Sequence, residues 1–97
     1  MDNINNENNE DKKSITTNFI TAILDIAFAD LAHGKTVRDK SLTISKDLKN
    51  DETAKNINIS EVKDILLSID ELIKAYQSAR DKLNKVVLTL EVNKSKN

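Results

Sequence analysis

The sequence predicts an all-α protein built as an antiparallel hairpin of two long helices. Apolar residues follow a heptad pattern through the second half of the chain, and a similar stretch of about equal length precedes it. The chain has one Gly and no Pro, which excludes turn-rich β folds. Its 97 residues are enough for one small domain.

The clearest pattern lies in the second half. Apolar side chains recur every seven residues and again three residues later, as at the a and d positions of a helix packed along a seam. The a positions are Val62, Ile69, Tyr76, Leu83 and Leu90, and the d positions are Ile65, Leu72, Ala79 and Val86. The e positions are Leu66, Ile73, Arg80 and Val87. Such a wide stripe predicts two neighbours, as in a helical bundle.

The start of this second helix is marked by a capping box. Asn58 suits the N-cap, Glu61 follows three residues later, and Ile57 and Val62 suit a hydrophobic staple. We therefore expect a helix over about 58–92, roughly 50 Å long.

The first helix is expected over about 14–48, with Ser14 as its N-cap. A four-and-three spacing runs from Phe19 through Asp30 and His33 to Ile44. Gly34 interrupts this spacing. Gly lowers the stability of a helix interior by about 1 kcal/mol relative to Ala, and it often follows the last residue of a helix. Two helices over 14–33 and 36–48 are the alternative. The heptad phase persists across Gly34, which favours the continuous helix.

Three segments lie outside the helices. Five of the first nine residues are Asn, so residues 1–13 are expected to be a disordered tail. Residues 14–92 form the hairpin domain, and residues 93–97 are expected to fray. The connection over 49–57 contains Asn50, Asp51 and Asn56, which suit turns. Two arms of equal length with a short link predict an antiparallel hairpin.

One hairpin leaves apolar surface uncovered. Ordering about 70 residues costs on the order of 100 kcal/mol of conformational entropy. The surface buried between two helices seldom offsets this cost alone. We therefore expect a homodimer forming a four-helix bundle, or docking on the helices of a partner protein. Arg80 is either a partner-facing charge or an edge residue that covers the seam. The residues expected at this interaction surface are Leu66, Ile73, Arg80, Val87, Ile20, Leu24 and Phe28.

A polar layer interrupts the apolar seam of the first helix. Asp30 and His33 are three residues apart and share a helix face. Such a layer fixes register, and a proton-transfer pair or half of a metal site is the alternative. In a hairpin centred near residue 53, Asp30 would lie opposite Tyr76 and contact its hydroxyl or Arg80. His33 would face Ile73.

Composition limits the function. The chain has one His and no Cys, so we expect no catalytic site, metal or cofactor. The net charge of −1 argues against nucleic acid, although Lys35, Arg38 and Lys46 could line one end of a dimeric regulator. We expect a structural or interaction protein, and a small chaperone or adaptor is the alternative.

The expected compartment is the cytoplasm. The acidic start of the chain lacks the pattern of a signal peptide, although specialised export without a cleavable signal stays open. The apolar run Phe19 to Ala32 is 14 residues long and contains Asp25 and Asp30. We expect it to be too short and too polar to span a bilayer.

Three bacterial secretion-related families resemble this chain in outline. It is similar in size and topology to the secreted helical hairpins of the type VII pathway and to type III needle subunits. It lacks the Trp of the first family's turn and the Pro of the second's. Val62 followed by Arg80-Asp81-Lys82-Leu83 resembles the C-terminal helix of the flagellar hook–basal-body junction subunit. This covers about a quarter of the chain, and Ala75-Tyr76-Gln77 precedes the tetrapeptide instead of following it. The resemblances imply, as a further form of the adaptor alternative, a secretion-apparatus subunit that binds a partner's amphipathic helix.

Overall fold

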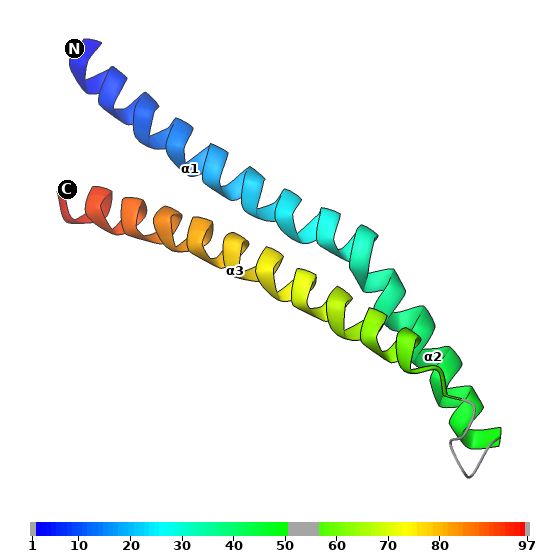
Figure 1. Ribbon diagram of the computed structural model, residues 1–97. Coiled ribbons are helices and arrows are strands. Elements are labelled where there is room, and N and C mark those ends of the chain that lie inside the picture. Colours follow the sequence, from blue (N-terminus) through cyan, green and yellow to red (C-terminus); the bar gives the residue numbers. More distant parts are fainter. Residues whose placement is uncertain (1, 51–56, 97) are drawn as a thin grey trace. The chain divides into compact units, whose positions relative to one another are not determined.

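The computed structural model describes residues 2–50 and 57–96, and nearly all of these are helical. In chain order the elements are α1 (Asp2–Ala29), the π-helical turn η1 (Asp30–Gly34), α2 (Lys35–Asn50) and α3 (Ile59–Lys96). The chain runs out along α1, η1 and α2 and returns along α3 (Figure 1). This confirms the predicted all-α, antiparallel two-helix hairpin.

The start of α3 confirms the predicted N-cap. The side-chain Oδ1 of Asn58 accepts a hydrogen bond from the backbone N–H of Ser60 at 2.9 Å. The carbonyl oxygen of Asn58 accepts the N–H groups of Glu61 at 3.1 Å and Val62 at 3.3 Å. The bonds from Ser60 and Glu61 satisfy N–H groups that the first turn of a helix leaves without partners, and the bond from Val62 is the first regular bond of α3.

The helices extend further than the sequence pattern indicated. α1 begins at Asp2, so Ser14 is not an N-cap, and the segment expected as a disordered tail lies within the helix from residue 2. The Oγ of Ser14 instead accepts a bond from Asn18 one turn later, at 3.4 Å. α3 continues to Lys96, past the end expected at 92. No Gly or Pro occurs in either extension, so neither contains a strong helix breaker.

Gly34 lies in a helical path that continues from α1 into α2. The five residues of η1 form a π-helical turn, and the backbone on both sides is right-handed helical, with φ −63° and ψ −43° at Ala29 and φ −62° and ψ −43° at Lys35. A π turn adds a residue to an α-helix without ending it. The continuous first helix is therefore the correct alternative, with a local widening that the spacing did not predict.

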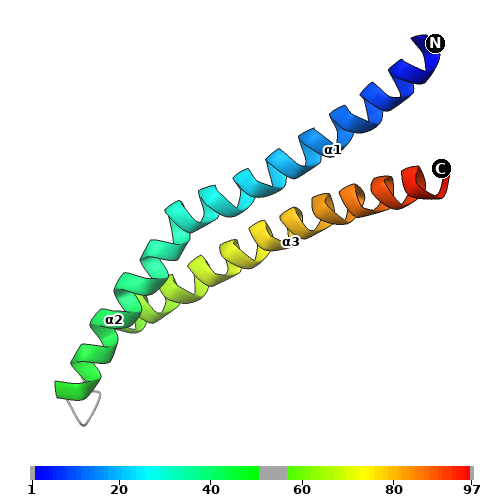
Figure 2. The ribbon, with the colours of Figure 1, turned by 180° about the vertical axis from the view of Figure 1, so that it is seen from behind.

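The chain divides into two compact units, each an antiparallel helix pair. The first unit contains Met1–Ile26 and Tyr76–Asn97, and the second contains Ala27–Ala75. In the first unit, Asp25 of α1 contacts Ser78 and Lys82 of α3. In the second unit, Lys40 of α2 contacts Asp64 of α3 at 2.6 Å. Each helix pair can be followed from both sides (Figures 1 and 2).

Small side chains form the contact between the paired helices. In the first unit, Ala22 is 0% exposed and Ala79 is 2% exposed. In the second unit, Ala29, Gly34 and Ser68 are buried. We call this line of contact the seam. Small residues allow two helix backbones to approach closely. Many of the larger apolar side chains lie outside the seam.

Candidate helix-docking surface

The structure corrects the phase of the predicted seam on α3. The expected d positions do face the paired helix, since Ala79 and Val86 are buried and Ile65 and Leu72 are half-buried. Four of the five expected a positions are instead exposed. Val62 is 38% exposed, Ile69 36%, Tyr76 46% and Leu90 51%, while Leu83 is half-buried.

A polar contact accounts for this phase. Asp25 accepts hydrogen bonds from Ser78 Oγ at 2.9 Å and from Lys82 Nζ at 2.7 Å. The side chains of Asp25 and Lys82 are each 28% exposed. Rotating α3 so that Tyr76 and Leu83 faced α1 would separate these partners and leave a partly buried carboxylate unpaired, which is costly.

The displaced a positions join the e positions on the outside of α3. Together they repeat at intervals of four and three residues, as a helix-packing face does. Leu66 is 57% exposed, Ile73 47% and Val87 49%, so the exposure expected for these residues is observed. We call this set the outer face of α3: Val62, Leu66, Ile69, Ile73, Tyr76, Arg80, Leu83, Val87 and Leu90.

A shallow groove lies on the outer face within the first unit. The groove has a volume of about 250 Å³, and the exposed residue Arg80 forms part of its lining. Ile26 of α1 lines it from the opposite helix. The α3 residues that line it are Tyr76, Ala79, Arg80, Leu83, Asn84 and Val87. A groove bordered by aliphatic side chains and one cation can accept an apolar side chain from another helix.

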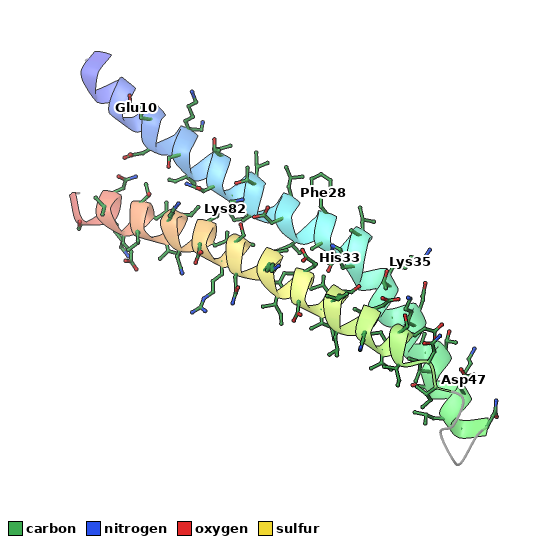
Figure 3. The ribbon with its side chains drawn as sticks, in the orientation of Figure 1. Glu10, Phe28, His33, Lys35, Asp47 and Lys82 are labelled. Carbon is green, nitrogen blue, oxygen red and sulfur yellow. The ribbon has the colours of Figure 1, made fainter. Side chains whose placement is uncertain are left out.

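The expected interaction residues of α1 are also exposed. Ile20 is 52% exposed, Leu24 42% and Phe28 64%. Figure 3 shows Phe28 on the side of α1 that points away from α3. The exposure of these side chains is observed, and their role in binding stays a prediction.

Of the residues expected in the polar layer, His33 lies near α3 in the second unit. His33 is half-buried and lines a hollow of about 280 Å³ in the second unit, where its α3 neighbours include Ser68 and Glu71. The sequence had placed Ile73 opposite His33. The predicted contact of Asp30 with Tyr76 or Arg80 joins residues of different units and stays a prediction.

Sequence reasoning missed the cluster of Asp25, Ser78 and Lys82. The two hydrogen bonds from Lys82 and Ser78 lower the pKa of Asp25 below its ordinary value of 3.8, because both stabilise the charged carboxylate. Lys82 lies between the helices of the first unit (Figure 3). The available signal was the position of Asp25 between Ala22 and Ala29 on one helix face, which marks it as a seam residue.

Two further properties of the described residues bear on function. They contain no group of three or more His, Asp or Glu side chains that could hold a metal ion. By length and composition alone, the helix Glu10–Asn50 could cross a membrane, with a mean hydropathy of 1.4 in a window that is 11% buried. The mostly buried core helix of a soluble protein and a signal sequence near the N-terminus meet the same criterion. The cytoplasmic location therefore stays a prediction.

Comparison with known proteins does not assign the chain to a family. No protein-family model, curated protein or solved structure matches it.

Proposed function

We propose that this protein is a non-enzymatic structural or interaction protein that binds a further helix through the outer face of α3. The observation that supports this is the exposed heptad pattern, in which aliphatic side chains such as Leu66, Ile73 and Val87 recur on the side of α3 that the seam leaves open. A helix keeps such a pattern exposed at a cost in solubility, and another helix covers it well.

Covering the apolar side chains of this face favours association. Full burial of an aliphatic side chain contributes about 1.5–3 kcal/mol, so covering the exposed half contributes roughly 1 kcal/mol for each residue. The aliphatic side chains of the face together offer on the order of 7 kcal/mol, before the cost of association is subtracted. A second contact, such as one through α1, would strengthen the complex further.

Site-specific photo-crosslinking in the producing cell tests this proposal. A benzophenone side chain replaces Ile73 on the outer face, and in a matched variant it replaces Lys74, whose side chain is 71% exposed. We expect a protein adduct, identified by mass spectrometry, from position 73 and a much weaker one from position 74. Equal labelling at the two positions would contradict the proposal.

A chaperone or adaptor is the second candidate function. It is favoured by exposed apolar residues of α1 and η1, since a client protein could contact these residues as well as the outer face of α3. Phe28 is 64% exposed and Leu31 is 77% exposed. A foreign protein in stoichiometric amounts, crosslinked both from Phe28 and from Ile73, would favour the adaptor over self-assembly.

A further inference from the structure

We propose that the outer face of α3 binds the same face of a second copy of this chain, with the two α3 helices antiparallel. This inference rests on the proposed function and identifies its partner. It is argued from α3 alone, which is one uninterrupted helix from Ile59 to Lys96. Positions along its outer face are therefore related by helix periodicity.

An antiparallel pair centred near residue 78 matches the layers of the face from Leu66 to Leu90, and Val62 lies beyond them. In antiparallel coiled coils, the two kinds of core position pack against each other across the pair. The resulting layers join Leu66 with Leu90, Ile69 with Val87, Ile73 with Leu83, and Tyr76 with Arg80 of the second copy. Three layers are aliphatic on both sides, and the polar layer lies at the centre.

The residues that flank the face are self-complementary in this register. Lys63 would lie beside Glu91 of the second copy, which pairs opposite charges at both ends of the interface. Asp70 would lie beside Asn84, whose amide can donate to the carboxylate. Gln77 would lie beside its own copy on the two-fold axis. All five side chains are exposed in the single chain.

Arg80 selects the antiparallel orientation. A parallel pair in register would place the two Arg80 guanidinium groups against each other in an apolar seam, where like charges repel strongly. The antiparallel pair instead places each Arg80 beside Tyr76 of the second copy. A guanidinium group can stack on the tyrosine ring or donate a hydrogen bond to its hydroxyl.

In this arrangement, the groove of the first unit can accept a side chain of the second copy. It is lined by Arg80, Leu83 and Val87, among others, and its volume is about 250 Å³. In the proposed register, Ile73 of the second copy lies in the layer of Leu83 and projects toward this groove. An aliphatic knob in such a hole is the packing unit of helix pairs.

Cysteine crosslinking of the full-length chain tests the register, since the sequence has no Cys. Under mild oxidation, Gln77→Cys is expected to form a disulfide-linked dimer. A mixture of Lys63→Cys and Glu91→Cys chains is expected to form the mixed dimer. Leu66→Cys alone is expected to link roughly tenfold less than Gln77→Cys, because antiparallel packing separates its two copies far beyond disulfide range.

Charge exchange provides a test that needs no oxidation. Lys63→Glu is expected to weaken the dimer measured by sedimentation equilibrium, and the double variant Lys63→Glu with Glu91→Lys is expected to restore it. Circular dichroism confirms that each variant is folded. Failure of the double variant to recover at least part of the lost association overturns the inference.

The remaining outcomes separate this inference from the proposed function. Efficient self-linking of Leu66→Cys overturns the antiparallel pair in favour of a parallel one, and the proposed function stands. A folded monomer at tens of micromolar overturns the inference, and crosslinking of Ile73 to a different protein would then keep the proposed function. A folded monomer without any adduct from Ile73 overturns both.

Discussion

At the scale of single residues, Asp25 determines which face of α3 meets α1. Its carboxylate accepts bonds from Ser78 and Lys82, and the side chain is 28% exposed. Aliphatic contacts are non-directional, so several rotations of α3 bury similar apolar area. The Asp25 carboxylate keeps both of its donors within hydrogen-bond distance in only one of these rotations. Asp25 therefore contributes to the choice of seam as well as to its stability.

Replacing Asp25 is expected to make stability less dependent on pH. The pKa of Asp25 in the folded chain lies below its ordinary value of 3.8, so its contribution is present above that value and is lost as the pH falls through the lowered pKa. Asp25→Asn should lower the melting temperature at pH 7, and the difference from the unmodified chain should shrink below about pH 4. Asp81→Asn, at an exposed position of α3, is the control. An equal loss at pH 7 and pH 3 would contradict this account.

Gly34 is expected to tolerate a larger side chain. A methyl group there would lie 3.5 Å from an Arg38 nitrogen and 3.6 Å from Asp30 Oδ1, which are ordinary contact distances. Because Ala is a better helix former, Gly34→Ala should raise the free energy of unfolding by about 0.5–1 kcal/mol. Chemical denaturation measures this. A destabilised variant would indicate that the π turn needs the freedom of glycine.

At the scale of the helices, sequence predicted the periodicity better than the phase. The heptads of α3, its N-cap at Asn58 and the continuity of the first helix all follow from local patterns. The phase of the seam does not follow from local patterns. Val62 and Ile69 are apolar and are therefore predicted to lie in the core, whereas Ser68 and Asp25 are polar and are not. The phase depends instead on contacts between residues far apart in the chain, such as Asp25 with Ser78, 53 residues away, and Lys40 with Asp64.

The small residues of the seam are expected to resist enlargement. Ala79 is 2% exposed, so Ala79→Leu adds three carbons where the helices are in close contact. Overpacking of this kind costs about 1–3 kcal/mol. Lys85→Leu, at an exposed position of the same helix, should change the free energy of unfolding much less. A similar effect of both substitutions would argue against a tightly packed seam.

We expect Arg80 to weaken the dimer and to favour its antiparallel orientation. Arg80→Leu replaces the one charged residue of the outer face with an aliphatic side chain, so the association measured by sedimentation should strengthen severalfold. The disulfide yield of Gln77→Cys in the same background should fall, because parallel pairs are no longer penalised. An unchanged yield would show that Arg80 does not set the orientation.

At the scale of the whole molecule, most of the large apolar side chains lie outside the seam. Among the described residues, the buried apolar side chains are three alanines and one valine, while nineteen large apolar side chains are exposed. A sequence of this composition predicts a helical hairpin with uncovered surface. It does not reveal what covers that surface, because the same stripe suits a second copy or another protein's helix.

The exposed apolar surface implies that folding and association are linked. A dimer is stabilised by mass action, so its melting temperature rises with protein concentration, whereas that of a monomer does not. We expect the unmodified chain to melt at a higher temperature as its concentration is raised from about 1 to 100 micromolar, over the range where a dimer of moderate affinity forms. Ile73→Lys, which places a charge in the middle of the outer face, should melt at a lower temperature that is independent of concentration. Lys74→Ala keeps the face intact and should behave as the unmodified chain does. If the unmodified chain melts at one temperature over this range, the hairpin is stable by itself, and the outer face of α3 contributes nothing to its folding.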